Sequence, residues 1–219
     1  MIIAGKLVSS SDGAMIIDRK IISLKECILN VDAMKQPITI SLIAPVYRVE
    51  KYIGKFADSV FSQSYPHIQF IFVNDGTDDS SMEILNSMIE NEYSHLKERV
   101  IIVNQPHSGL PVARESGVRY ATGDYIWHVD SDDWVEKDAV ERIVSKIEET
   151  GSDLIYFNFI QEYTDRSKVK RERNYEVNAA SAYVRNIFNH KSYACVWNKC
   201  VRRSVYDSHK KYYARYSYS

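Results

Sequence analysis

Long apolar runs are missing from this sequence. No uninterrupted stretch approaches the roughly 18 apolar residues that a membrane-spanning helix requires, and the N-terminus lacks the basic flank, apolar core and small-residue cleavage site of a secretion signal. Cysteine is scarce too, with three residues, Cys27, Cys195 and Cys200. This odd, small number fits reduced thiols that act as small apolar side chains better than a disulfide framework. We therefore expect a cytoplasmic protein.

An excess of charge is absent from the chain as a whole. Lysine and arginine total 28 against 29 aspartate and glutamate, a formal net charge of −1, so no nucleic-acid partner is expected. The charges are unevenly distributed, however. Residues 161–219 carry 13 Lys or Arg against 5 Asp or Glu, a net of +8, whereas residues 1–160 carry 15 against 24, a net of −9. The front of the chain is acidic and the back is basic.

What is present is an ordinary globular composition, with 45% hydrophobic and 26% charged residues, which argues against disordered, collagen-like and coiled-coil classes. No repeat of roughly 20–50 residues and no low-complexity tract interrupts it. Residues 1–36 show poor periodicity, with one weakly amphipathic helix expected over 21–34. We interpret residues 1–36 as an N-terminal accessory extension, followed by the main domain over 37–219.

Short apolar runs alternate with helical patterns from residue 38 onward. The expected strands cover 38–44, 68–73, 100–103, 125–129 and 154–160. The expected helices cover 52–60, 80–89, 109–121 and 137–149. Ser80 and Glu83 have the spacing of a capping box at the start of the second helix. The alternation predicts an α/β fold with a mostly parallel twisted sheet and helices on both faces, which binds ligands at the carboxyl ends of its strands.

The last third of the chain has a different character. It is polar and charged over 161–176, helical in pattern over 179–188, and aromatic and basic over 193–205. Ten of the 16 tyrosines follow Gly151. We interpret this region as the part that holds a second substrate.

An acidic cluster follows the expected strand over 125–129. Asp130 and Asp132 alternate in the chain and can address one ion or ligand together, while Ser131 faces away and Asp133 follows. Carboxylates at this edge of a sheet predict a site for a hard divalent cation, with a solvated turn and helix cap as the alternative. An EF-hand loop is rejected because Val135 occupies the place that needs glycine.

Two other strand ends carry candidate binding groups. Asp75, in an Asp-Gly turn, can accept the imide N–H of a uracil, and Tyr47, in the turn that begins with Pro45, can stack on the ring face. An Asp-Gly turn of purely structural role is the alternative for Asp75. Arg114 can pair with a diphosphate, or it is an ordinary solvated helical arginine. The interpretation of these residues as binding groups is strengthened by their location, because three consecutive strand ends offer polar or aromatic groups to one crevice.

Taken together, these segments resemble the family-two glycosyltransferases, enzymes of the GT-A fold, over residues 39–205. Four motifs in order carry the resemblance: SLIAPVYRVEKYI, SVFSQSYPHIQFIFVNDGTDDS, SGLPVARESGVRYATGDYIWHVDSDDWVEKDAV and VWNKCVRRSV. Any one of them is weak evidence, whereas the ordered set is specific. The resemblance implies a GT-A domain over 37–219, with a donor half over about 37–135 and an acceptor half over about 136–219.

The resemblance also implies roles for the candidate residues. In this family the proline-valine-tyrosine turn and the aspartate of VNDG hold uridine, which implies that role for Pro45, Tyr47 and Asp75. The Asp-x-Asp motif falls on Asp130, implied to lie near the ribose, and on Asp132, implied to bind the Mn²⁺ or Mg²⁺ that bridges the diphosphate.

The sequence departs from the family pattern in two places. The family's ARN motif implies that Arg114 contacts the base or the phosphates, but its asparagine is replaced by Glu115. In polysaccharide-synthesising members, the segment matching residues 197–204 precedes a Glu-Asp pair that supplies the catalytic base. After Ser204 the sole acid is Asp207. We therefore expect the catalytic base to be absent or cut away, and the acceptor half to be incomplete at its C-terminus.

The expected function is transfer of a sugar, with inversion, from a nucleoside-diphosphate donor such as a UDP-sugar to a saccharide or lipid-linked acceptor. A nucleotide-sugar-binding protein without the base is the main alternative. A nucleotidyltransferase ranks low because no glycine-rich, basic phosphate loop follows the first strand of the regular pattern. The sequence leaves oligomerisation open.

The basic back third suggests two further hypotheses. The resemblance implies an acceptor that is a lipid-linked sugar at the inner membrane face. The +8 segment therefore predicts a peripheral contact with anionic lipid, through residues that include Arg202, Arg203, Lys210 and Lys211. A solvated basic face is the alternative. A structural zinc site is the least favoured hypothesis, because its candidate ligands lack the spacing of known zinc motifs. Those candidates are His190, Cys195, Cys200 and His209.

Overall fold

The computed structural model describes residues 14–17, 20–23, 36–162, 167–170 and 194–208. The chain separates into two compact units, Met1–Pro37 and Ile38–Ser219. In the first unit, β1 (Ala14–Ile17) and β2 (Lys20–Ser23) pair as an antiparallel hairpin. The helix expected from residue 21 is therefore wrong over 21–23, which belong to β2, and its remainder lies outside the described residues.

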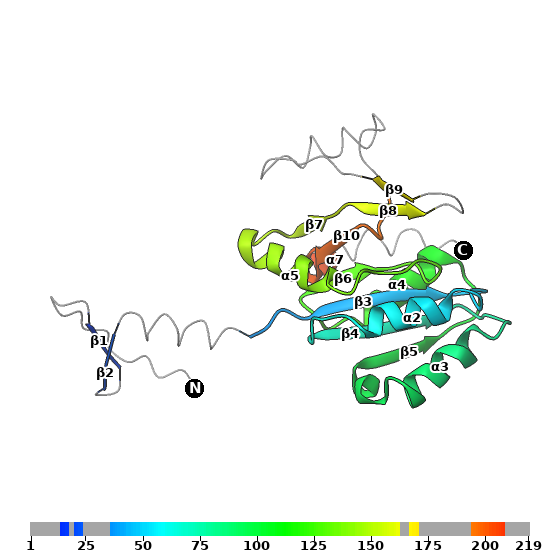
Figure 1. Cartoon of the computed structure of the whole chain (residues 1–219), viewed down its shortest axis with the longest axis horizontal. Helices are drawn as coiled ribbons and strands as arrows, with labels where there is room; N and C mark the ends of the chain where they lie inside the picture. Colours follow the sequence, from blue (N-terminus) through cyan, green and yellow to red (C-terminus); the bar gives the residue numbers. More distant parts are fainter. Residues whose placement is uncertain (1–13, 18–19, 24–35, 163–166, 171–193, 209–219) are drawn as a thin grey trace. The chain divides into compact units, whose positions relative to one another are not determined.

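The second unit is built on a six-stranded sheet in the order β5-β4-β3-β6-β10-β7 (Figure 1). The four strands β3 (Ile40–Val46), β4 (Ile68–Asn74), β5 (Val100–Asn104) and β6 (Tyr125–His128) are mutually parallel. β10 (Lys199–Arg202) lies between β6 and β7 (Leu154–Tyr156) and is antiparallel to both. The sheet is mostly parallel, as the alternating pattern predicts.

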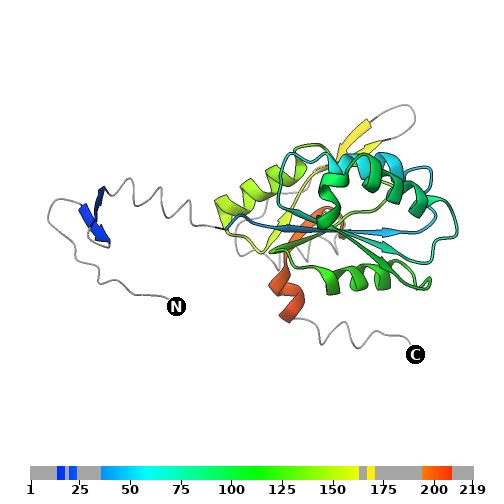
Figure 2. The same ribbon diagram turned by 90° about the horizontal axis from the view of Figure 1, so that it is seen from below.

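Helices cover both faces of this sheet. The helices are α2 (Ile53–Phe61), α3 (Ser81–Asn91), α4 (Leu110–Tyr120), α5 (Ala139–Thr150) and α7 (Arg203–Ser208), with the 3-10 helix η1 (Ser94–Arg99) before β5. Alternate side chains of β3 enter different apolar clusters: Leu42 packs in the larger one, with α2, α3 and α5, and Ile43 packs with α4 in the smaller one. Figure 2 shows α4 on the opposite side of the sheet from α2 and α3.

Close packing of α4 on the sheet depends on Gly117. A Cβ at this position would lie 2.3 Å from Cγ2 of Ile43 and 3.3 Å from Cγ2 of Val73. The absent side chain lets the helix backbone approach β3 and β4 directly. This contact sets the position of the helix that carries Arg114.

Three local expectations are corrected by the structure. The run over 154–160 is split between β7 and β8 (Phe159–Glu162), and β8 forms an antiparallel hairpin with β9 (Ser167–Lys170). The inserted strand β10 lies within the aromatic and basic segment 193–205, for which no strand was predicted. The capping box does not form, because Ser80 makes no side-chain bond to the helix and Asp79 instead accepts the N–H of Ser81 at 3.1 Å. The helix expected over 179–188 lies outside the described residues.

Among the helices of the described residues, none has the length and apolar character needed to cross a bilayer.

Candidate nucleotide-sugar site

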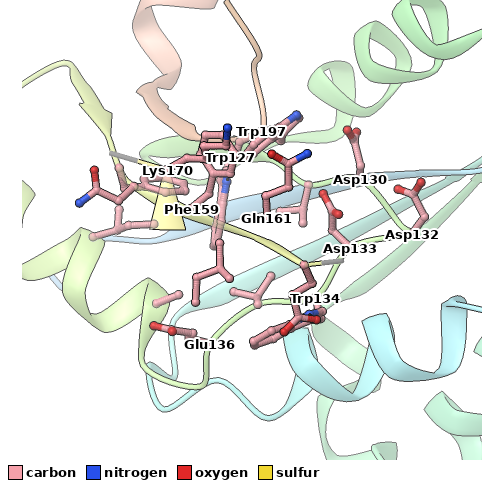
Figure 3. Close-up of a pocket in the computed structure, with 18 of the residues that line it drawn as sticks. Trp127, Asp130, Asp132, Asp133, Trp134, Glu136, Phe159, Gln161, Lys170 and Trp197 are labelled. Atoms are coloured by element: carbon pink, nitrogen blue, oxygen red, sulfur yellow. Dashed lines mark hydrogen bonds between the residues drawn. The ribbon is translucent and has the colours of Figure 1, made fainter. Parts of the chain in front are cut away.

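The candidate residues gather at one edge of the sheet, where the carboxyl ends of β3, β4, β5 and β6 meet. Beside the end of β6 lies a cavity of about 1450 Å³. Figure 3 shows the carboxylates of Asp130, Asp132 and Asp133 together on one side of this cavity and the rings of Phe159 and Trp197 on the other. Pro45, Tyr47, Asp75 and Arg114 do not line this cavity; they lie at the ends of β3 and β4 and on α4.

Pro45 and Tyr47 lie at the end of β3. The backbone carbonyl of Pro45 accepts a hydrogen bond of 2.6 Å from the buried hydroxyl of Ser131. Ser131 thus faces away from the cavity, as the alternation of Asp130 and Asp132 predicts. The ring of Tyr47 stacks on the imidazole of His107, with 4.0 Å between centroids and 17° between planes. The turn after β3 is therefore tied to the acidic cluster on one side and to the loop after β5 on the other.

Asp75 is buried at the end of β4, and its carboxylate is surrounded by donors. Oδ1 accepts from Gln105 Nε2 at 2.6 Å and from the Ser108 N–H at 2.9 Å, while Oδ2 accepts from the Gly109 N–H at 2.9 Å. Nδ1 of His107 lies 2.9 Å from Oδ2. Burial raises the pKa of Asp75, but these hydrogen bonds together outweigh it and leave the pKa below its usual value. Asp75 is thus an ionised carboxylate that also organises the loop before α4.

Gln105 and His107 were not among the residues predicted from the sequence, although both follow the end of a predicted strand. Their loop lies close to Gly76, whose φ is +67° and whose hypothetical Cβ would be 2.7 Å from the backbone nitrogen of His107. Only glycine is tolerated there, because any side chain would collide with the backbone of this loop. Their polar side chains, directly after the end of a strand, were the feature of the sequence that could have indicated a role in the site.

Arg114 and Asp130 form an ion pair that joins the two parts of the site. Nη2 of Arg114 lies 2.5 Å from Oδ1 of Asp130, and both side chains are largely buried. Nε of Arg114 is buried and has no hydrogen-bond partner within the described parts of the chain. The neighbouring Glu115 instead pairs with Arg119 at 2.8 Å along the exposed side of α4. Glu115, at the position of the family's asparagine, thus pairs with Arg119 and leaves the ion pair between Arg114 and Asp130 in place.

His128, near the end of β6, lies close to Arg114 and is buried. Burial first, and the charge of Arg114 second, lower the pKa of His128 to about 4. The imidazole of His128 is therefore uncharged at neutral pH. The ring of Tyr206 contacts it edge-on, with 6.1 Å between centroids.

The acidic cluster forms a turn after β6, in which the N–H of Asp133 donates to the carbonyl of Asp130 at 3.1 Å. Asp132 is exposed, and its carboxylate makes no hydrogen bond or ion pair with any residue the structure describes. Two effects raise the pKa of Asp133 to about 6. The larger is desolvation of its carboxylate by the surrounding protein, and the smaller is repulsion from Asp132 and Asp130. The cluster therefore has excess negative charge that a cation would relieve.

The chemistry of this donor set fits Mg²⁺ or Mn²⁺, since both prefer carboxylate oxygens. In the described parts of the chain, however, no group of three or more His, Cys, Asp or Glu side chains is arranged to hold a metal by itself. Mg²⁺ is commonly held by one or two carboxylates together with substrate phosphates. Asp132 and Asp130 would therefore need phosphate oxygens to complete the coordination shell.

The remaining cavity wall combines aromatic rings with basic side chains. The ring of Phe159 contacts Trp197 edge-on at 4.5 Å between centroids, and the indole N–H of Trp127 donates to the carbonyl of Trp197 at 2.6 Å. Trp134 is partly exposed, with Nζ of Lys55 4.9 Å from its ring centroid. Flat rings beside charged and polar groups suit the binding of a polar ligand that has apolar faces.

The other expectations for the C-terminal part are partly tested. Cys200 is buried in the larger apolar cluster, and this burial raises the pKa of its thiol, so its role is that of a small apolar side chain. No zinc cluster is found in the described parts of the chain, and His190 and His209 lie outside them. Asp207 pairs with Arg203 at 3.2 Å and does not line the cavity.

Comparison with solved structures identifies the class of fold. The S. aureus protein TarS, residues 1–349 in complex with UDP-GlcNAc, superimposes with a TM-score of 0.64 and 23% identity, over 79% of this chain and 48% of TarS. The mannosyltransferase PcManGT of Pyrobaculum calidifontis, with GDP-Man and Mn²⁺, has a TM-score of 0.50 and 19% identity, over 56% of this chain and 36% of PcManGT. The protein has the GT-A fold, which confirms the fold expected from the sequence.

Sequence comparison identifies the family. The pattern of Glycosyl transferase family 2 matches residues 41–209, so the chain belongs to this family. Glycosyltransferase GlyA of Streptococcus pneumoniae is 40% identical over 55% of this chain and 16% of its own length. EpsH of Bacillus subtilis, named as a glycosyltransferase, is 31% identical over 78% of this chain and 49% of its own length. The chain thus spans half or less of these relatives.

Proposed function

We propose that this protein binds a nucleoside-diphosphate sugar, favouring UDP-sugars, and transfers the sugar with inversion to a saccharide or lipid-linked acceptor. The observation that carries the proposal is the Arg114–Asp130 ion pair of 2.5 Å. It connects a cluster suited to a nucleobase, around Tyr47 and Asp75, with a carboxylate cluster suited to a phosphate-bound cation. A nucleotide diphosphate presents these two features in the same order, with the base at one end and the phosphates at the other.

The donor would lie along the edge of the sheet. In this arrangement Pro45 and Tyr47 border the base and Asp75 accepts its imide N–H, as a buried and ionised carboxylate is able to do. Asp130 lies toward the ribose, and Arg114, paired with Asp130, offers the positive charge of its guanidinium to the phosphates. A complex of TarS with UDP-GlcNAc supports a nucleotide-sugar donor for this fold.

Asp132, with Asp130, would hold Mn²⁺ or Mg²⁺ together with the diphosphate. When bound, the cation would supply Lewis-acid stabilisation of the leaving diphosphate. The close approach of the carboxylates of Asp130, Asp132 and Asp133 supports a cation at this place, because a positive charge would relieve their mutual repulsion.

The reaction is a displacement at the anomeric carbon of the sugar. The acceptor hydroxyl oxygen forms a bond to this carbon, the bond to the diphosphate oxygen breaks, and the nucleoside diphosphate leaves with the electron pair. A carboxylate base takes the hydroxyl proton. The Glu-Asp pair that supplies this base in the family does not occur after Ser204 in the sequence, and Asp207 is paired with Arg203.

The acceptor would enter the cavity beside the carboxylates, where Trp134, Phe159 and Trp197 offer rings for a sugar to contact.

A lipid-linked acceptor would bring the basic segment 161–219 toward anionic headgroups, through charges such as Arg202. Arg202 pairs with Asp153 at 2.5 Å, so part of this charge is already balanced within the protein. Pelleting with anionic vesicles at low salt, lost at high salt, would support this peripheral contact.

The donor proposal is tested by calorimetric titration of the protein with UDP, UDP-sugars, GDP and CDP, each with and without Mn²⁺. We expect UDP and one UDP-sugar to bind with metal present. Failure of every nucleotide to bind at millimolar concentration would refute donor binding. A supplied acceptor mixture then separates transfer from binding, because release of UDP supports an enzyme. Tight binding without release across saccharide and lipid-linked acceptors would favour the nucleotide-sugar-binding alternative.

A further inference from the structure

We propose that the imidazole of His107 is a built-in substitute for the nucleobase, which the donor must displace in order to bind. The inference rests on the proposed function, since it takes Tyr47 and Asp75 as the base-binding groups. His107 occupies both of them at once. It would therefore lower the affinity for the nucleotide without contacting the phosphates or the acceptor.

The stacking partner of the base is already taken. The ring of His107 lies 4.0 Å from the ring of Tyr47, at 17° between planes. An aromatic ring inserted between the two would need two contact distances, together roughly 7 Å. That face of Tyr47 thus has no room for a nucleobase while the imidazole remains there.

The space beside the hydrogen-bond partner of the base is taken as well. Nδ1 of His107 lies 3.2 Å from the backbone carbonyl of Asp75, its hydrogen-bond partner, and 2.9 Å from Oδ2 of the carboxylate. A carbonyl oxygen only accepts, so this ring nitrogen carries the proton and donates to it. A uracil offers the same pair of features, a flat face and one ring N–H. Imidazole and base would therefore compete for the same two groups.

The side chain of His107 is able to leave while its backbone stays in place. About half of this side chain is exposed, at 52%. The backbone is held from both sides, because the Ser108 N–H donates to Asp75 and Gly76 packs against the His107 nitrogen. Rotation about the side-chain bonds alone would expose the ring of Tyr47 and clear the space beside the carboxylate of Asp75.

The other three donors to Asp75 differ from His107. Two are backbone N–H groups of Ser108 and Gly109, and the third is the amide of Gln105, held at 2.6 Å. These bonds keep the carboxylate ionised and oriented before and after the exchange. Only the imidazole combines a donor with an aromatic face, which is why we assign the displacement to it.

The test measures UDP binding by calorimetry in the presence of Mg²⁺ for the wild type, His107→Ala and His107→Phe. We expect His107→Ala to bind UDP about three- to tenfold more tightly, since the exposed bond and stack of one imidazole no longer have to be broken. His107→Phe retains a ring without the donor and should fall between the two. Pyrophosphate, which has no base, should bind all three proteins equally.

His95→Ala is the matched control, because His95 is also an exposed histidine beside a tyrosine, with 6.4 Å between its ring and that of Tyr93, and it lies outside the site. It should leave UDP affinity unchanged. Weaker or equal UDP binding by His107→Ala, with pyrophosphate binding intact, would overturn the substitution role while leaving the donor proposal standing. Absence of UDP binding in every protein would refute the donor proposal, and the role of His107 with it.

Discussion

Loss of one half-buried carboxylate should destabilise the turn after β3, which carries Tyr47, one of the proposed base-binding residues. Asp79 precedes α3 and accepts three hydrogen bonds: from the Thr77 hydroxyl at 2.7 Å, the Ser81 N–H at 3.1 Å and the Glu50 N–H at 3.0 Å. Thr77 in turn accepts the N–H of Arg48 at 2.8 Å. The carboxylate thus anchors both the start of α3 and the segment after β3.

The magnitude follows from the shift in the pKa of Asp79. Burial raises this pKa, but the hydrogen bonds from Ser81, Thr77 and Glu50 outweigh it and lower the pKa from 3.8 to about 2. A shift of this size corresponds to about 2 kcal/mol of folding free energy, an order-of-magnitude figure. We expect Asp79→Ala to lower the free energy of unfolding at pH 7 by roughly 2–3 kcal/mol, since three donors also lose their acceptor.

The pH dependence has a definite sign. Because the folded pKa lies below the unfolded one, the contribution is fully present above pH 3.8 and is lost as the pH falls toward 2. The difference between wild type and Asp79→Ala should therefore shrink by about 1 kcal/mol between pH 7 and pH 3. Urea denaturation followed by circular dichroism at both pH values measures it.

Asp78→Ala is the matched control. Its carboxylate is the next one along the chain, exposed to solvent and paired with Arg48 at 2.7 Å. Solvent screens such a pair, so its removal should change the free energy of unfolding little. The reasoning is refuted if Asp78→Ala costs as much as Asp79→Ala, or if the effect of Asp79→Ala is the same at pH 3 as at pH 7.

Three further predictions concern the site and its support. Asp132→Ala should abolish the metal-dependent part of UDP affinity, because two carboxylate ligands become one, and equal metal dependence in wild type and variant by calorimetry would contradict the assignment. Asp75→Asn should weaken UDP more than pyrophosphate and lower the free energy of unfolding by about 1–3 kcal/mol, since an amide group would face buried donors. Equal losses for both ligands would place Asp75 away from the base. Gly117→Ala should destabilise the protein by about 1–3 kcal/mol in urea denaturation, because its Cβ would lie 2.3 Å from Cγ2 of Ile43. A stabilised variant would show that the helix-forming preference of alanine, about 1 kcal/mol over glycine, exceeds the clash.

The local hydrophobic pattern of the sequence was sufficient to predict the parallel strands of the sheet and the helices that cover them. The strands β3, β4, β5 and β6 fall on four of the expected apolar runs, and α2, α3, α4 and α5 fall on the expected helical patterns. Buried parallel strands must be apolar on both faces, and helices that cover them must show one apolar face, so both leave a periodic signal. The family followed from the ordered motifs at the ends of these strands and in the later VWNKCVRRSV segment.

Pairings between distant segments left no such signal. β10 is inserted between β6 and β7 from more than 40 residues away along the chain, and its short sequence KCVR, with a basic residue at each end, carries no periodic signal of a strand in the sheet. The roles of Gln105 and His107 likewise depend on contacts with Tyr47 and Asp75, which come from other strand ends. Residue types and spacing indicate which groups can bind a base. Whether those groups are free or already bonded to each other depends on packing between segments distant in sequence, which only the folded chain establishes.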